Sequence, residues 1–263
     1  MTMLKALWAY RGFILGSVRR EFESRYQNSL LGAAWTILNP LAMIVVYTVI
    51  FSQVMRARLP GVDNTMAYSI YLCAGVLTWG LFAEIVTRAQ TVFLENATLL
   101  KKLNFPRMSL PVTVVANAVL NFVIVFSLFT VFLIASGNFP GLVFLALLPT
   151  LAVMVLFAIG LGVTLGILNV FFRDVGQFFS IFMQFWFWLT PIVYPASILP
   201  APLADYMHWN PMARLIGASQ DILVHGRWPQ WMGLLPVLLL ALLLCALGMR
   251  LFRRHSGELV DEL

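Results

Sequence analysis

Residues 108–172 read MSLPVTVVANAVLNFVIVFSLFTVFLIASGNFPGLVFLALLPTLAVMVLFAIGLGVTLGILNVFF, without a charged side chain. The turn signal in this stretch is SGNFPG at residues 136–141, which combines glycines with Asn and Pro. A helix needs about 20 apolar residues to cross a hydrocarbon core about 30 Å thick. The stretch therefore predicts two transmembrane helices, at about 110–135 and 142–170.

The composition extends this prediction to the whole chain of 263 residues. Apolar residues make up 61% and charged residues 11%, and the mean hydropathy is +0.88. A soluble domain has about 45–50% apolar and about 25% charged residues. We therefore expect one all-α transmembrane domain over residues 1–263, which excludes a soluble enzyme, a disordered chain and a disulfide-linked scaffold. Cys73 and Cys245 lie in apolar runs and are interpreted as small hydrophobic residues.

Four further apolar stretches bring the expected number of spans to six: about 31–54, 67–94, 176–195 and 231–250. With the N-terminus inside, twelve Lys and Arg residues fall in cytoplasmic segments and four on the other side. This bias predicts that both termini are cytoplasmic. The net charge of +6 comes from basic residues scattered between apolar runs, so we expect no nucleic-acid partner.

Residues 1–25 and 196–230 lie outside the six expected spans. In residues 1–25, apolar positions such as Leu4, Leu7 and Val18 recur at helical spacing among charged residues, which predicts an amphipathic interfacial helix. Prolines interrupt residues 196–230, yet this segment stays apolar and aromatic, so we predict a re-entrant segment. The alternative is an ordinary extracytoplasmic loop.

The sequence lacks the motifs of a nucleotide site and of common catalytic centres. A phosphate-binding loop ends in Gly-Lys-Ser/Thr, and none of the three lysines follows a glycine. His208, His225 and His255 are far apart and lie outside the predicted spans. We therefore expect no metal site, no catalytic residue and no cofactor bound by this chain. If transport here uses ATP, another polypeptide hydrolyses it.

Glu84 and Arg88 lie four positions apart inside the expected span 67–94, so they share one helix face. An ionisable side chain at the centre of a span costs about 2.5–3.5 kcal/mol on insertion scales. We therefore predict an intramembrane ion pair. Two interpretations stay open: the pair satisfies itself near the inner interface, or it contacts a moving neighbour or a translocation path.

Aromatic residues concentrate in the expected span 176–195, where Phe178, Phe182 and Phe185 share a face. Aromatic rings offer flat, uncharged surfaces along which the C–H faces of a sugar chain can slide. A candidate substrate path combines rings of this span with rings of the first span: Trp35, Tyr47, Phe51, Phe178, Phe182, Phe185 and Trp186. The alternative is that these rings face lipid.

Small residues form a stripe in the expected span 142–170. Ala158, Gly162 and Gly166, with Gly160 beside them, recur at four-residue spacing. Such a stripe predicts close packing against another helix, whose identity the spacing leaves open.

Residues 95–107 join the second and third expected spans and are predicted to form a cytoplasmic coupling helix. Asn96 or Thr98 can cap its start, and Pro106 ends it. Its apolar side chains would be exposed, and an exposed apolar patch indicates a partner surface. The expected partner contacts are Glu95, Leu99, Leu100, Lys101, Leu103, Phe105 and Arg107. The alternative is a helix that rests on the membrane.

Several motifs lie along the chain: RYQNSLLG at 25–32 running into WTILNP at 35–40, the segment 95–107, NVFFRDV at 169–175, LTPIVYP at 189–195 and Asn210-Pro211. In combination they resemble the membrane permease of type-2 ABC exporters that move polysaccharides such as O-antigen, capsule and teichoic acid. The resemblance is closest to O-antigen permeases.

This resemblance implies a homodimer of six-helix subunits, bound to two cytoplasmic ABC ATPase subunits that hold ATP and magnesium. It implies that the interfacial helix and segment 95–107 contact those ATPases. The aromatic residues would line the path of a lipid-linked polysaccharide across a bacterial inner membrane, and the proline-rich segment would form an outer gate. Alternatives are a permease for teichoic acid, drugs or lipids, and a membrane-embedded sugar-modifying enzyme.

Overall fold

The computed structural model describes residues 11–26, 34–54, 59, 66–102, 107–255, 257–258 and 262. Every regular element among these residues is a helix. The described part of the chain therefore agrees with the all-α expectation.

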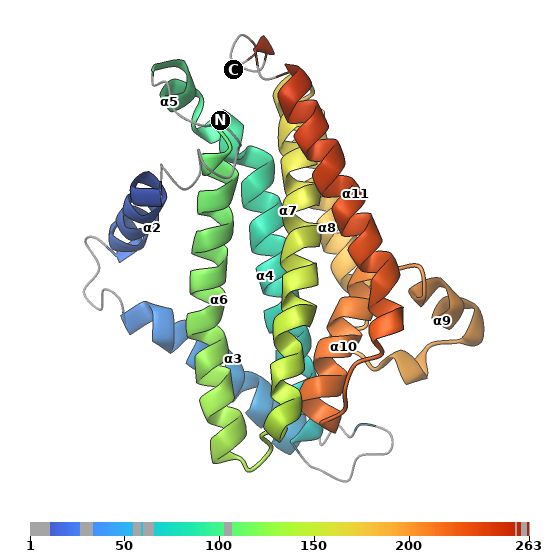
Figure 1. Cartoon of the computed structure of the whole chain (residues 1–263). Helices are drawn as coiled ribbons and strands as arrows, with labels where there is room; N and C mark the ends of the chain where they lie inside the picture. The colour runs from blue at the N-terminus through green and yellow to red at the C-terminus, as the bar shows by residue number, and fades with distance from the viewer. Residues whose placement is uncertain are drawn as a thin grey trace.

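Four helices are long and apolar enough to cross a membrane, and they stand side by side in Figure 1. They are α4 (Ala67–Glu95), α6 (Ser109–Ala135), α7 (Leu147–Phe171), which continues the 3-10 turn η3 (Gly141–Ala146), and α11 (Trp231–His255). The break between α6 and α7 falls at the predicted SGNFPG turn, where Gly137 and Gly141 have positive φ angles of 71° and 66°. Glycine tolerates this conformation because it has no Cβ.

The other two expected spans appear as shorter helices. In α3 (Trp35–Thr48), 14 residues are α-helical before a π-helical turn, η2 (Val49–Val54), while α8 (Asp174–Trp188) has 15 residues. A 15-residue helix is about 22 Å long, less than the bilayer core. The chain leaves the helix after α8 because Pro191 disfavours helical backbone at the preceding residue. By length and composition alone, four of the six expected spans are therefore found in the described residues.

The central helix of the bundle is α4, which packs against α6, α7 and α10 (Pro211–His225). In the most apolar stretch of α4, 72% of the residues are buried, compared with 22% in α6 and in α11. The ring of Phe82 in α4 stacks on the ring of Phe157 in α7, with the ring centroids 5.6 Å apart. The outer helices instead expose apolar side chains such as Val131 and Leu243, as expected of surfaces that face lipid.

The predicted small-residue stripe brings α7 against two neighbouring helices. A Cβ at Gly162 would lie 2.7 Å from the Cβ of Ala89, and one at Gly166 would lie 2.5 Å from the Ala89 carbonyl oxygen. On another side of α7, a Cβ at Gly160 would lie 2.8 Å from the backbone nitrogen of Cys245 in α11. The predicted close packing is confirmed, and its partners are α4 and α11.

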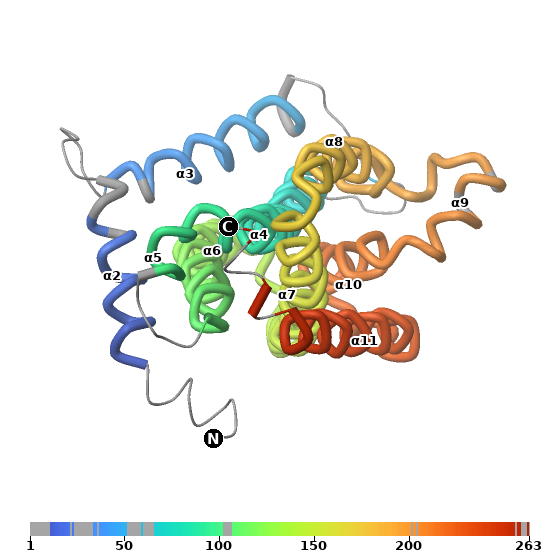
Figure 2. Tube along the Cα trace, turned by 90° about the horizontal axis from the view of Figure 1, so that it is seen from above, coloured from blue at the N-terminus to red at the C-terminus, as the bar shows by residue number. Residues whose placement is uncertain are grey.

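Shorter helices surround this bundle. Figure 2 shows α2 (Arg11–Tyr26) on one side of it, while α9 (Ala201–Met207) projects from the opposite side. The short α5 (Ala97–Lys102) follows α4 directly. In Figure 1, α5 and the C-terminal part of α11 lie at one end, called here the α5 end, and α10 lies toward the other, called here the α10 end.

We expect Gly166→Ala to lower the free energy of unfolding by about 1–3 kcal/mol, because the added methyl group overlaps the Ala89 carbonyl oxygen. Thermal unfolding of the purified protein in detergent measures this loss. The matched control is Gly80→Ala in α4, where a Cβ meets no atom within 4 Å. Equal unfolding temperatures for the two variants would contradict the tight contact between α4 and α7.

Candidate functional site

One arginine of α4 joins two carboxylates near the α5 end. The Arg88 Nη1 atom lies 3.4 Å from Oε1 of Glu84, one helical turn earlier. The Arg88 Nη2 atom forms an ion pair with Oε1 of Glu21, which belongs to α2. The pair predicted inside α4 therefore extends to a third charged residue on a different helix.

Two amides of α6 complete this polar network. Asn117 Nδ2 donates to Oε2 of Glu21, and Asn121 Nδ2 donates to Oε1 of Glu84 over 2.8 Å. The three charged side chains are only 28–34% exposed. Because ionised groups in such surroundings need counter-charges and donors, the network holds α2, α4 and α6 in one relative position.

Sequence reasoning missed Glu21, Asn117 and Asn121 as members of this network. The two asparagines stand four residues apart in a mostly apolar helix, so they share a face. That pattern was a usable signal for a polar contact within the bundle. Glu21 had no such signal, because α2 contains several charged residues and only the tertiary structure selects one of them.

Segment 95–107 differs in part from its prediction. The expectation that Leu100 is exposed was wrong: it is buried in a cluster with Phe93 of α4 and Val114 of α6. The reason is that α5 follows α4 after a single residue and turns its apolar side onto the ends of α4 and α6. Leu103 and Phe105 lie outside the described residues.

The remaining expected contact residues surround a cavity or face outward. Glu95 and Lys101 are exposed, while Leu99 and Arg107 are half-buried. Glu95 and Leu99 line a cavity of about 380 Å³ that also reaches Glu21 and Arg88. Glu95 and Leu99, two of the expected contact residues, are therefore neighbours of the charged network at the α5 end.

The aromatic residues of α8 divide into an outer and an inner group. Phe178 and Phe185 are 70% and 65% exposed, and Phe182 is 39% exposed. Trp186 instead turns inward, where its ring lies 6.0 Å from Trp79 and 5.3 Å from Phe82. The outer rings form an exposed apolar face, whereas Trp186 packs into the core.

The aromatic residues of the first expected span lie on α3 and η2. Trp35 is exposed, and Tyr47 contacts Phe51 edge-on with centroids 6.3 Å apart. The Phe51 ring stacks on Tyr68 of α4 at 5.3 Å. Whether these rings and those of α8 contact a substrate stays a prediction.

Side chains of α4 and α7 hold the two ends of α8. At its start, Gly176 N–H donates to Asn169 Oδ1 over 3.0 Å, and Gln90 Nε2 donates to the Gly176 carbonyl over 2.9 Å. Beyond its end, the Tyr68 and Tyr71 hydroxyl groups donate to carbonyls of Val193 and Pro191. The bond to Asn169 satisfies an N–H group of the first turn of α8, and the tyrosine bonds satisfy carbonyls of the turn that follows the helix.

Asn210 links α8 to α10. Its Oδ1 accepts from the Trp186 indole N–H over 2.9 Å and from the backbone N–H of Met212, which caps α10. Its Nδ2 donates to the Thr190 hydroxyl over 3.0 Å. Asn followed by Pro is a signature of a helix start, so Asn210-Pro211 could have predicted this cap from the sequence.

Among the described residues, no three His, Cys, Asp or Glu side chains are placed to hold a metal ion. The structure also separates the histidines, since His208 follows α9, His225 ends α10 and His255 ends α11.

Comparison with known proteins identifies relatives over most of the chain. The family model for the ABC-2 type transporter matches residues 14–224. An O-antigen export system permease protein of Klebsiella pneumoniae is 32% identical over 208 residues, covering 79% of this chain and 78% of that protein. The O-antigen export system permease protein of Myxococcus xanthus is 28% identical, and the match covers 99% of this chain and 99% of that protein. The polysialic acid transport protein of Escherichia coli is 22% identical over 92% of this chain and 93% of its own.

We expect Arg88→Met to destabilise the protein more than Glu21→Gln, because it removes the cation that two carboxylates share. The double variant should lose less than the sum of the two single losses, with a coupling energy of about 0.5–2 kcal/mol. Thermal unfolding of the purified variants gives these differences. Arg250→Met, at an exposed position of α11, is the matched control. If the losses of the two single variants simply add in the double variant, Arg88 and Glu21 are not energetically coupled.

Proposed function

This chain belongs to the ABC-2 type transporter family, and from that premise we propose that it is the transmembrane permease of an ATP-driven polysaccharide exporter. The observation that carries the proposal is its similarity to O-antigen export permeases, which in one case extends over 99% of both chains. The proposed cargo is a lipid-linked, O-antigen-like polysaccharide that moves from the cytoplasm across the inner membrane.

The proposed working unit is a homodimer with two cytoplasmic ABC ATPase subunits. A long hydrophilic polymer does not fit an occluded pocket, so it requires a continuous canal, which two copies related by a two-fold axis can form. The exposed rings of α3 and α8 are suited to line it, because an uncharged aromatic surface contacts sugar C–H faces without strong hydrogen bonds. In this arrangement α3 and α8 complete the set of six spans, with both termini in the cytoplasm.

ATP and magnesium would be held by the partner subunits. When these subunits close, their movement must be transmitted to the canal. The proposed route starts at α2, at Glu95 at the end of α4, and at Leu99 and Lys101 of α5, which would meet the ATPases. Movement of α2 would pass through Glu21 to Arg88, and movement of α5 would pass through Leu100 to the base of α4. Because α4 is the central helix, a shift there alters the positions of α6, α7 and α10 together.

Deletion of the gene tests this function. We expect the cells to lose the surface polysaccharide and to accumulate its lipid-linked form on the cytoplasmic side, since synthesis continues without export. Immunoblots of surface glycan and mass spectrometry of extracted lipid-linked glycan measure the two effects. The tagged permease should copurify with a nucleotide-binding subunit. Unchanged surface glycan in the deletion strain, or ATP hydrolysis by the isolated chain, would contradict the proposal.

We expect Phe178→Ala and Phe185→Ala each to slow export about fivefold, the equivalent of the ~1 kcal/mol that one ring contact contributes. Unfolding temperatures should stay near normal, because both rings are exposed. Trp186→Ala should instead destabilise the protein, since its ring packs into the core. The rate of glycan appearance at the cell surface measures export, and Leu243→Ala on α11 is the control for an exposed apolar residue. Normal export in both Phe variants would assign these rings to lipid contact.

A further inference from the structure

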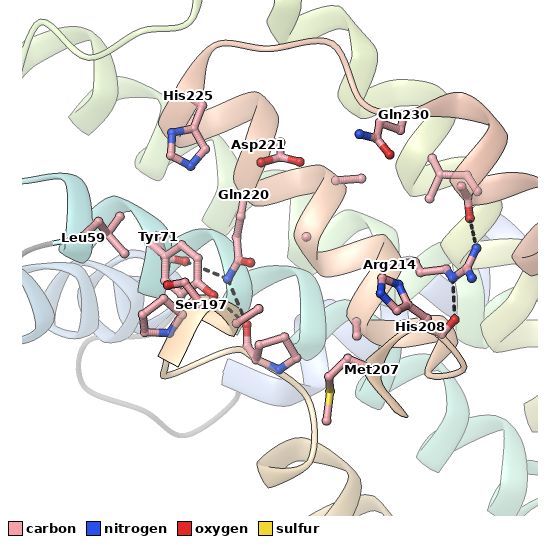
Figure 3. A pocket seen from close by; sticks show the side chains of 18 residues that line it. Leu59, Tyr71, Ser197, Met207, His208, Arg214, Gln220, Asp221, His225 and Gln230 are labelled. Carbon is pink, nitrogen blue, oxygen red and sulfur yellow. Dashed lines mark hydrogen bonds between the residues drawn. The ribbon is translucent and has the colours of Figure 1, made fainter. Parts of the chain in front are cut away.

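A second cavity, of about 600 Å³, lies between α10, the first turns of α11 and the segment that follows α8. Figure 3 shows its lining, with Arg214 and Asp221 set apart along α10 and Tyr71 on the facing wall. Its volume falls within the range of about 300–1,000 Å³ that small-molecule sites occupy. The cavity is at the α10 end, far from the charged network.

One face of α10 forms the floor of this cavity. Arg214, Gly217 and Asp221 recur at spacings of three and four residues, so they share that face. A Cβ built at Gly217 meets no atom within 4 Å, so the space above the glycine is open. The floor therefore has a cation at one end, a carboxylate at the other and, between them, the open space above Gly217.

The walls of the cavity are held in place by hydrogen bonds. Gln220 Nε2 donates to the carbonyls of Tyr71 and Pro191 over 3.4 and 3.3 Å. The Tyr71 hydroxyl group donates to the Pro191 carbonyl over 3.0 Å, which joins α4 to the same turn. Cap bonds from Asn210 fix the start of α10. A site supported in this way is preformed, so a ligand would not have to order it.

Both charged groups of the floor keep unused hydrogen-bonding capacity. Arg214 Nε donates to the His208 carbonyl over 2.8 Å and Nη1 to the Gly233 carbonyl over 2.7 Å. A guanidinium group has five N–H donors, so three remain for a ligand. In the described part of the chain, the Asp221 carboxylate accepts no side-chain hydrogen bond; burial raises its pKa, while His225 and Arg227 act in the opposite direction.

We propose that this cavity is an exit-side subsite that binds a short segment of the exported glycan. Sugar hydroxyl groups both donate and accept, so they match guanidinium donors, a carboxylate acceptor and the amide of Gln230. Tyr71 and Leu234 supply apolar surface for the C–H faces of the rings. The proposal rests on the proposed function, because that function supplies the glycan and places the α10 end outside.

The spacing of the charges favours a glycan over a lipid headgroup. Arg214 and Asp221 lie seven positions apart, which corresponds to about 10 Å along the helix axis. The phosphate and ammonium groups of a zwitterionic headgroup are joined by only two carbon atoms, too short a link to reach both ends. A chain of sugar rings can span the floor. Weak binding at such a site would hold the emerging chain between transport steps without trapping it.

The test measures binding of short, delipidated fragments, released by mild acid from the surface polysaccharide of the same cells, to the purified permease–ATPase complex. We expect Gly217→Leu to weaken this binding about tenfold or more, because the leucine side chain fills the open space above position 217. Leucine also has a higher helix propensity than glycine, so α10 should form. Gly217→Ala is the matched control and should bind within about twofold of the unchanged complex. Asp221→Asn, which removes the charge and keeps the shape, should also weaken binding several-fold.

Fragment binding by Gly217→Leu equal to that of the unchanged complex would overturn the subsite. A second result would also overturn it: the unchanged complex binds glycerophosphoethanolamine but no glycan fragment, and Gly217→Leu abolishes that binding. The cavity would then be a lipid-headgroup site. The deletion strain distinguishes a failure of the subsite from a failure of the proposed function. Normal surface glycan in that strain refutes the proposed function itself, whereas lost glycan together with fragment binding unaffected by Gly217→Leu refutes only the subsite.

Discussion

The contact between α4 and α7 is the interaction on which the rest of the structure depends. Gly162 and Gly166 let the backbones approach until Ala89 fills the space that two side chains would need. This approach makes α4 the central helix, buried over most of its apolar length. Helices in a membrane gain little from the hydrophobic effect, so close van der Waals contact and hydrogen bonds must hold them together.

Because α4 is central, its polar residues connect it to three other segments of the chain. Arg88 joins it to α2 near the α5 end, Gln90 joins it to the start of α8, and Tyr71 joins it to the turn beyond α8. Each of these contacts satisfies a charge or a backbone group of a helix bundle in which few other partners are at hand. A helix with such contacts along its length can carry a displacement from one end of the bundle to the other. The proposed path from the ATPases to the canal makes use of that property.

The sequence predicted the elements whose signals are local. The uncharged run and its SGNFPG turn predicted α6 and α7, and the small-residue stripe predicted a close contact. The exposure of Leu100 was predicted wrongly, because an apolar residue in a cytoplasmic segment can equally pack onto the ends of its own bundle. Trp186 and the outer phenylalanines look alike in the sequence, since a one-residue step along α8 decides which ring faces Trp79 and which faces outward.

By itself, then, the sequence determined the membrane class, the helical architecture, the lack of a nucleotide-binding motif and the family resemblance, because these depend on composition and on residues close together in the chain. The tertiary structure decided that Glu21 reaches Arg88, that α4 and α11 are the partners of the glycine stripe, and that Arg214 and Asp221 face one cavity with Tyr71. These pairings join residues far apart in the chain. They depend on how helices are rotated and placed against one another, which the pattern within a single helix does not specify.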